Sequence, residues 1–264
     1  MRKILLSLLI GGGVCLSCVK ENVLSDCVTG DNSVTFRTHL SDTRATESSF
    51  ENGDAVSIFA TDDYYGELGY DNYSDNSQYV YSSGEFRPAG SDDSIAYPDE
   101  YTSLHFYAVW PYSASYTGYE LDFSVSQDQS TSESYAYSNL MLARTDETRA
   151  ETVDLYFEHL MCKVVINIHS DNFPAGERIC VFNNVYKDAT INLNDGDVST
   201  TGDQTYVYGS LNGTNSFKVL LPPQSIPAGT QFFIFQIGEK SWQWKPSKTL
   251  ILASGVEYEY DLSI

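Results

Sequence analysis

The sequence has few residues of the kinds that build catalytic or metal sites. It contains four histidines and five cysteines among 264 residues. We find no phosphate-binding glycine loop, zinc motif or nucleophile elbow in it. His39, His105, His159 and His169 lie on or beside expected strands without a second ligand at metal spacing, so we interpret them as structural. The sequence therefore predicts a protein that is not an enzyme and has no metal or cofactor.

Positive charge is also scarce. Fifteen Lys and Arg residues stand against thirty-six Asp and Glu residues, which gives a formal net charge of -21. A nucleic-acid-binding protein would show the opposite balance, with a basic patch or stripe. The charge excludes that class and favours solubility at a cell surface.

No apolar run is long enough to cross a bilayer, which needs about 20 residues. The apolar stretch Ile4 to Ile10 follows two basic residues and precedes the small-residue exit Leu16-Ser17-Cys18, as in a secretory signal peptide. A cysteine at this point resembles a bacterial lipobox, so we expect cleavage before Cys18 and a lipid on its thiol. The alternative is a plain signal peptide with incidental cysteines, because Cys15 stands where a lipobox usually has leucine.

Helical periodicity is missing from the rest of the chain. Twenty tyrosines, thirteen phenylalanines and many Ser, Thr, Asn and Asp residues favour strands and turns. Alternating or continuous apolar patterns predict strands at Val34–Leu40, Ala55–Ala60, Leu104–Trp110, Val153–Phe157, Cys162–His169 and Val256–Ile264. A polar run from Arg144 to Glu151 separates two groups of them. The sequence thus predicts an all-β protein with two antiparallel sandwiches.

Two stretches without regular periodicity are predicted to be loops. Ser41 to Ser49 is polar and directly follows the first expected strand, so we expect an exposed loop there. Thr61 to Glu100 is dense in Tyr, Asp, Ser, Asn and Gly, and we expect a long loop region with short extended pieces at Gln78–Tyr81 and Ile95–Tyr97.

Cys162 and Cys180 flank an expected hairpin turn at Asp171 to Gly176. Simple pairing across that turn would hold the two thiols too far apart for a disulfide bond. We therefore expect two free, buried cysteines that pack as small apolar side chains.

Six regions of the sequence together carry a resemblance to a known family. They are Thr43–Ala60 (TRATESSFENGDAVSIFA), Asn76–Tyr112 (with NSQYVYSSGEF, IAYP and LHFYAVWPY), Asn139–Ala143 (NLMLA), Leu155–Ile168 (LYFEHLMCKVVINI), Leu220–Thr230 (LLPPQSIPAGT) and Leu252–Leu262 (LASGVEYEYDL). In this order and spacing they resemble the fimbrillin (Mfa-like) family, the secreted lipoprotein pilins and pilus-associated proteins of gut and oral Gram-negative anaerobes.

The resemblance implies two transthyretin-like β-sandwiches and a role in surface fimbriae. In the best understood members, an arginine-directed protease cuts after the first strand, and a strand of another subunit fills the groove. Arg44 and Ala45 match that cleavage position. The expected organisation is a signal peptide at 1–17, a lipidated propeptide with the first strand at 18–44, an N-terminal β-sandwich at 45–150 and a C-terminal β-sandwich at 151–264.

The first strand would fill the groove with Val34, Phe36 and Leu40, each worth about 1.5–3 kcal/mol when buried. Its removal would also unpair a row of backbone groups, which a donated strand could satisfy. The expected partners are therefore other fimbrial subunits through donor-strand exchange, with a host or bacterial surface receptor as a further candidate. The sequence ends at Ile264 inside its last strand. We expect polymerisation if Val256–Ile264 can leave its sandwich, and otherwise a tip or accessory subunit.

The expected location is the cell outer membrane, reached only through the lipid, and then the fimbrium. The main alternative function is an outer-membrane lipoprotein that binds glycans through exposed aromatic rings. The candidate rings are those of Tyr64, Tyr65, Tyr70 and Tyr73 and of the pair Trp242 and Trp244. Core packing is the other interpretation of the tryptophan pair.

Overall fold

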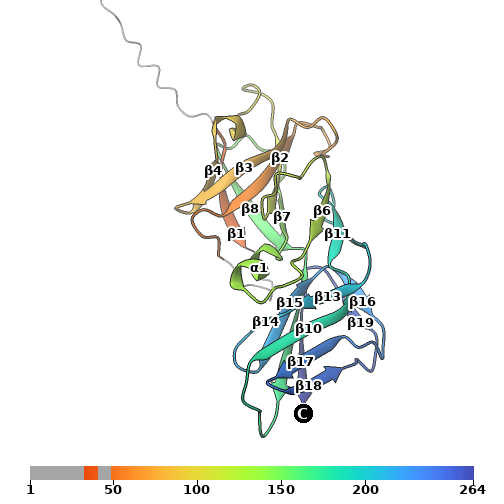
Figure 1. Cartoon of the computed structure of the whole chain (residues 1–264). Helices are drawn as coiled ribbons and strands as arrows, with labels where there is room; N and C mark the ends of the chain where they lie inside the picture. Colours follow the sequence, from red (N-terminus) through yellow and green to blue (C-terminus); the bar gives the residue numbers. More distant parts are fainter. Residues whose placement is uncertain (1–32, 41–48) are drawn as a thin grey trace, which may run out of the picture. The chain divides into compact units, whose positions relative to one another are not determined.

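The computed structural model describes residues 33–40 and 49–264, with Leu40 described by its backbone only (Figure 1). Strands make up about half of this part, and its helices are the short α1 (Ser132–Tyr137) and the 3-10 turn η1 (Ser91–Asp93). None of the helices in these residues is long and apolar enough to span a membrane. The predicted all-β class is confirmed.

The first sheet closes on itself as a barrel in the order β1-β4-β3-β2-β5-β7-β8. Its strands are β1 (Thr35–Leu40), β2 (Ala55–Thr61), β3 (Ser74–Ser82), β4 (Glu85–Pro88), β5 (His105–Trp110), β7 (Met141–Arg144) and β8 (Thr152–His159). Neighbouring strands are antiparallel except for β1 and β8, which run parallel. β1 therefore closes the barrel by joining β4 to β8.

Four further sheets occur in the described chain. One contains β6 (Glu120–Ser124), β11 (Asp188–Asn192) and β12 (Val198–Thr201) in the order β12-β11-β6. A second, β13-β10-β17-β18, contains β10 (Arg178–Val185), β13 (Thr205–Tyr208), β17 (Phe233–Ile237) and β18 (Lys240–Trp244). A third, β14-β15-β9-β20, contains β9 (Cys162–His169), β14 (Ser210–Leu211), β15 (Ser216–Leu221) and β20 (Glu257–Ser263). The last pairs β16 (Gln224–Ile226) with β19 (Leu250–Leu252).

Buried apolar side chains form two clusters. One fills the barrel and includes Phe36, Tyr79 and Phe106. The other extends from the sheets around β9 and β10 to side chains on barrel strands such as Tyr107 and Val109. Strands β2, β5 and β7 are consequently buried on both faces. Burial on both faces explains why their sequences are nearly continuous apolar runs rather than alternating ones.

Strand pairing crosses the boundary expected near residue 150. β8 lies beyond that boundary but pairs with β1 and β7 of the barrel. β6 lies before it and pairs along β11, with Leu121 opposite Ile191. Residues Ser33–Ile264 form one compact unit by their contacts. The division into sandwiches at 45–150 and 151–264 stays a prediction, but the sheets are not confined to either side of residue 150.

A β-hairpin replaces much of the long loop expected between Thr61 and Glu100. β3 and β4 are joined by the two-residue turn Ser83-Gly84, and both turn residues have positive φ. Positive φ at both positions gives the turn a twist that matches the right-handed twist of antiparallel strands. The polar residues at the start of β3 hid its length from sequence analysis. The extended piece expected at Ile95–Tyr97 is not part of a strand.

The hairpin expected between the two central cysteines is wrong, because β9 and β10 belong to different sheets. β9 lies between β15 and β20, whereas β10 lies between β13 and β17. Cys162 and Cys180 are nevertheless free and buried, as expected. Burial raises the pKa of each thiol to about 12, so neither ionises near neutral pH.

A core substitution in β11 tests whether the described chain unfolds as one unit. Ile191 is 0% exposed, so Ile191→Ala should lower the free energy of unfolding by about 2–5 kcal/mol. Ile251→Ala is the matched control, because that side chain is 62% exposed. Chemical denaturation followed by tryptophan fluorescence should show one shifted transition, reported by Trp110 in the barrel and by Trp242 and Trp244 outside it. Two transitions, with only one shifted, would contradict a single unit.

Candidate functional site

β1 is held in place from two sides. On one side, β8 pairs in parallel with all six residues from Thr35 to Leu40. On the other side, β4 pairs in antiparallel fashion with Phe36 and Arg37 only. The backbone N–H of Val34 extends this attachment by donating to the carbonyl oxygen of Ile95 at 2.8 Å. Loss of β1 would thus open the barrel and leave two unpaired strand edges, on β4 and on β8.

The inner face of β1 fills an aromatic socket in the barrel. Val34 and Phe36 are 1% and 0% exposed. The ring of Phe36 lies edge-on to Tyr79 and Phe106, with ring centroids 5.0 and 5.1 Å apart. Edge-on pairs of this kind add to the hydrophobic gain of burial. The side chain of Leu40, the third residue expected in the groove, lies outside the described part of the chain.

Thr38, on the same face of β1, places an unfavourable polar group in the barrel. Its hydroxyl oxygen is buried and has no hydrogen-bond partner within the part of the chain that the structure describes. A buried polar group without a partner costs about 1–3 kcal/mol. Residues two apart on a strand share a face, so this hydroxyl follows Phe36 into the barrel. β1 is therefore an imperfect occupant of its own socket.

The outer face of β1 carries basic side chains that contact an acid on β8. Arg37 Nε lies 3.2 Å from Asp154 Oδ1, and its Nη2 donates to Oδ2 at 3.4 Å. His39 Nε2 lies 3.0 Å from the same Oδ1, and the His39 ring stacks on Tyr156 with centroids 4.7 Å apart. The His39 hydrogen bond and, to a lesser extent, the charge of Arg37 hold the pKa of Asp154 below its usual value. Charge thus complements apolar burial in fixing β1 beside β8.

Three residues expected to act in maturation lie outside the described residues. They are Cys18, expected to carry the lipid, and Arg44 and Ala45, expected to flank the cleaved bond. Arg44 follows the last residue of β1 by four positions in the sequence. Its place just beyond the strand that closes the barrel is what a maturation site would need.

The remaining histidines have structural partners. His105 Nδ1 lies 3.4 Å from the carbonyl oxygen of Thr145, and His159 Nδ1 lies 2.9 Å from Asn139 Oδ1. His169 Nε2 lies 2.7 Å from an oxygen of Asp261 on β20. Within residues 33–40 and 49–264, His, Cys, Asp and Glu side chains form no group that could hold a metal ion.

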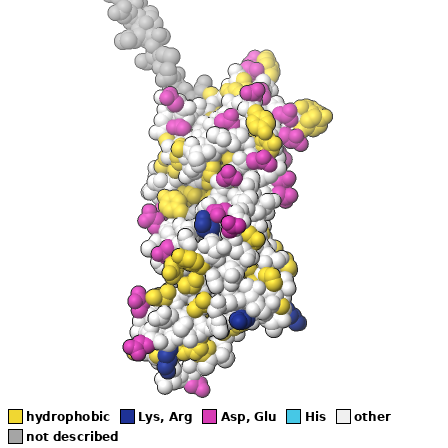
Figure 2. Space-filling view, turned by 45° about the vertical axis from the view of Figure 1, so that its right-hand side comes forward, with side chains coloured by type: hydrophobic (Ala, Val, Ile, Leu, Met, Phe, Trp, Pro, Cys, Tyr) yellow, Lys and Arg dark blue, Asp and Glu magenta, His cyan; other side chains and the backbone are white. Residues whose placement is uncertain are grey.

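The aromatic residues considered for glycan binding fall into two groups. Trp242 stacks on Phe235 with ring centroids 5.0 Å apart, and both tryptophans pack against the larger core cluster. Packing is therefore their evident role. Tyr64, Tyr65 and Tyr70 are 89%, 80% and 84% exposed. Figure 2 shows one face of the molecule, where acidic side chains are widespread and basic ones are few.

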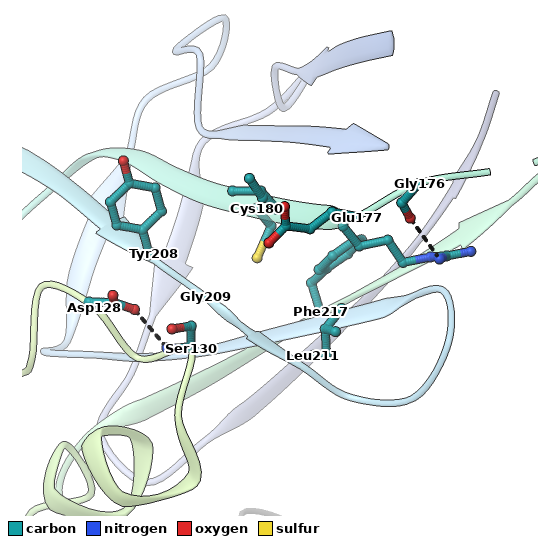
Figure 3. A pocket seen from close by; sticks show the side chains of 11 residues that line it. Asp128, Ser130, Gly176, Glu177, Cys180, Tyr208, Gly209, Leu211 and Phe217 are labelled. Carbon is teal, nitrogen blue, oxygen red and sulfur yellow. Dashed lines mark hydrogen bonds between the residues drawn. The ribbon is translucent and has the colours of Figure 1, made fainter. Parts of the chain in front are cut away.

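Sequence analysis missed a cavity of about 710 Å³, because its walls come from segments far apart in the chain. It lies where the chain passes through Gly209 from β13 in one sheet to β14 in another. Figure 3 shows Asp128, Ser130 and Tyr208 beside Glu177 and Cys180. The Ser130 backbone N–H donates to Asp128 at 2.9 Å, and bonds from Ser130 lower the pKa of that carboxyl. With the Cys180 pKa raised to about 12, the cavity offers no activated nucleophile from this thiol.

Comparison with known proteins identifies the class to which this all-β chain belongs. The model of the fimbrillin-like family matches residues 43–264, so the chain is a member of the fimbrillin-like family. This match confirms the resemblance carried by the sequence segments. A search of curated proteins gives no match.

Solved structures show the same fold. A candidate cell adhesion protein of Bacteroides ovatus has a TM-score of 0.69 at 17% identity, with 88% of this chain and 91% of that chain covered. One from Bacteroides uniformis has a TM-score of 0.67 at 22% identity, with 89% and 94% covered. A fimbrial protein of Bacteroides ovatus has a TM-score of 0.55 at 13% identity, with 88% and 50% covered. At such identities these similarities establish the fold.

Truncation of the inner ring of β1 should destabilise the barrel strongly. Phe36→Ala removes a fully buried ring from an aromatic cluster and should lower the free energy of unfolding by about 3–5 kcal/mol. Tyr101→Ala is the control, because Tyr101 is 80% exposed. Urea denaturation of both variants measures the difference. Equal stability of the two variants would show that β1 contributes little to the barrel.

The contacts of Asp154 should make the attachment of β1 sensitive to acid. The pKa of Asp154 is lower in the folded protein than in the unfolded chain. Its contacts therefore stabilise the fold fully above the unfolded pKa of about 3.9, and this stabilisation disappears as the pH falls through the folded pKa. Asp154→Asn should therefore be less stable than the parent at pH 7 and lose less stability on acidification. Thermal unfolding between pH 7 and 3 measures this, with the exposed loop variant Asp203→Asn as control. A parent-like acid profile in Asp154→Asn would contradict it.

Proposed function

We propose that this protein is a subunit of surface fimbriae that assembles when another subunit's strand replaces β1. The observation that carries the proposal is that β1 closes the barrel and that Arg44 follows β1 by four positions in the sequence. Membership of the fimbrillin-like family supports the fimbrial role. The descriptions of the similar solved structures, two for cell adhesion and one fimbrial, support adhesion as part of it.

The energetics favour replacement of β1 over simple loss. An empty socket would expose the rings that surround Phe36 and two rows of unpaired backbone groups on β4 and β8. Exposed strand edges pair readily with other chains. An incoming strand would restore the backbone hydrogen bonds and place alternate side chains in the socket. A subunit opened in this way would have a strong drive to capture a partner.

Maturation would couple release to assembly. The protein would be exported as a lipoprotein, with Cys18 lipidated at the outer membrane. Cleavage between Arg44 and Ala45 would separate residues 18–44, and with them both the lipid and β1, from the remaining chain. One cut would then free the subunit from the membrane and open the groove. A host or bacterial surface receptor would be the target of the assembled fimbria.

Glycan binding at the cell surface is the second candidate function. It is favoured by one observation, the exposure of Tyr64, Tyr65 and Tyr70, whose rings could stack on sugar faces. Neither the cavity beside Cys180 nor the smaller one beside His159 is lined by these residues. A tyrosine-lined groove is thus not among those two cavities, and strand replacement has the stronger support.

Arginine at position 44 should be essential for maturation. Arg44→Lys keeps the positive charge but removes the residue that an arginine-directed protease requires, so the precursor should accumulate and high-molecular-weight fibres should be lost. Arg149→Ala, which removes an arginine elsewhere, should be processed normally. Immunoblots of cell fractions and mass spectrometry of the mature N-terminus measure both outcomes. Normal fibres from Arg44→Lys, or a mature protein that begins at Cys18, would count against this route.

Cys18 should carry the lipid. Cys18→Ala should abolish metabolic labelling with a fatty acid and move the precursor out of the membrane fraction, because the thiol that accepts the lipid is gone. Cys15→Ala is the matched control and should remain labelled. Unchanged labelling of Cys18→Ala would remove the basis for anchoring at this residue.

A further inference from the structure

Two strands at opposite ends of the described chain are held in the same way. β1 pairs in parallel with β8, and β20 pairs in parallel with β9. β8 and β9 are consecutive strands, separated only by Leu160 and Met161. β20 is also an edge strand, bonded on one side to β9. Its edge position and its parallel pairing make β20 the candidate, among the described strands, to leave its sheet and enter the β1 socket of a second copy.

The two terminal strands, β1 and β20, carry outward charges of opposite sign. On the first pair, the basic residues belong to β1, where Arg37 and His39 contact Asp154 of β8. Arg37 also lies directly opposite Glu85 of β4, which forms an ion pair with Arg87 at 2.7 Å. Departure of β1 would deprive Asp154 of both its basic contacts. The empty groove would therefore present an acidic outer rim along β8.

On the second pair, the acidic residues belong to the terminal strand itself. Glu257 lies 3.5 Å from Lys163 Nζ on β9. Farther along β20, Glu259 accepts a hydrogen bond from Asn167 at 2.6 Å, and Asp261 lies 2.7 Å from His169. Each acid of β20 is thus matched by a donor on β9, its own neighbour.

These acids would face the wrong neighbour if β20 entered the β1 socket. With the apolar residues of β20 turned inward, its outward residues would be Glu257, Glu259 and Asp261, beside Asp154. Like charges on adjacent strands are destabilising. A shift of one residue would avoid this contact only by turning the acids into the barrel, because strand side chains alternate with a period of two. Whichever face of β20 turns inward, its acids therefore lie either on the outer face that carries Asp154 or inside the barrel.

The inner face adds a second requirement. The socket encloses the Thr38 hydroxyl without a hydrogen-bond partner in the described chain. Valine has nearly the shape of threonine and lacks the hydroxyl, so an aliphatic residue would remove the unsatisfied group without overfilling the site. The same face of β20 carries Tyr258, Tyr260 and Leu262, so this requirement alone does not exclude β20, and its outward acids decide against it.

We propose that the β1 socket selects a strand from a different kind of subunit, with a basic residue in the place of Arg37 and an aliphatic residue in the place of Thr38, and rejects β20 of a second copy. This proposal rests on the proposed function, because it specifies the strand that would replace β1. The protein then forms mixed assemblies and does not build a homopolymer through β20.

Peptide exchange into a cut but intact protein tests the proposal. A recognition sequence for a site-specific protease is inserted between Arg44 and Ala45 of the full chain. After cutting, β1 remains bound without a covalent link to the barrel. Fluorescent peptides are then added, and anisotropy measures their binding, with uncut protein as the control. The probes are a copy of residues 33–40, that copy with Arg37→Glu and His39→Glu, that copy with Thr38→Val, and a copy of residues 256–264.

The unmodified copy should exchange into cut protein only. The doubly acidic copy should bind about tenfold more weakly at low salt, and the difference should shrink at high salt. The Thr38→Val copy should bind about fivefold more tightly, because it carries no unsatisfied hydroxyl into the socket. The copy of residues 256–264 should bind at least about tenfold more weakly than the unmodified copy.

A charge swap in the protein gives a matched control. Cut protein with Asp154→Lys should prefer the doubly acidic peptide over the unmodified one. If the unmodified copy exchanges but the charge variants and the copy of residues 256–264 bind equally well, the selectivity is overturned while strand replacement stands. If the unmodified copy does not exchange at all, strand replacement itself fails, and the selectivity fails with it.

Discussion

The parallel pairing of β1 with β8 is the interaction on which the barrel depends. The other six strands form a continuous antiparallel series from β4 to β8, which without β1 would be an open sheet with two edges. β1 joins those edges and adds the buried ring of Phe36 to the aromatic cluster, against Tyr79 and Phe106. Closure and core filling therefore rely on one six-residue strand. Removing that strand would change the state of the whole barrel, because it would open the sheet and uncover its core together.

The other sheets of the described chain pack against one side of this barrel. β2, β5 and β7 are buried on both faces, since their outer side chains join the larger core cluster. The β6–β11 pairing adds a second connection across residue 150. The barrel wall opposite β1 is thus fixed by packing, whereas β1 contacts solvent through Arg37 and His39. In the proposed exchange, a new strand would therefore replace β1 without disturbing the packing of β2, β5 and β7 against the larger core cluster.

Sequence analysis predicted what local patterns determine. Alternation or continuous apolar sequence located most of β1, β2, β5, β8, β9 and β20 to within a few residues. It could not assign partners, because which strand lies beside another depends on contacts far apart in the chain. β8 was therefore grouped with the sheets that follow it, and β9 with β10. The unsatisfied hydroxyl of Thr38 and the cavity beside Cys180 were equally invisible, since both arise only when distant segments enclose them.

The two terminal strands show how similar geometry can carry different specificity. Both lie parallel to a central strand, and both alternate apolar and polar residues. Backbone hydrogen bonds are nearly independent of sequence, so pairing alone would let either strand occupy either place. The outward side chains supply the distinction, with bases on β1 facing Asp154 and acids on β20 facing Lys163, Asn167 and His169. Exposed charges add little to stability but much to the difference between a correct and an incorrect partner. In the proposed strand exchange, that difference would keep the groove open to one class of strand and closed to β20 of a second copy.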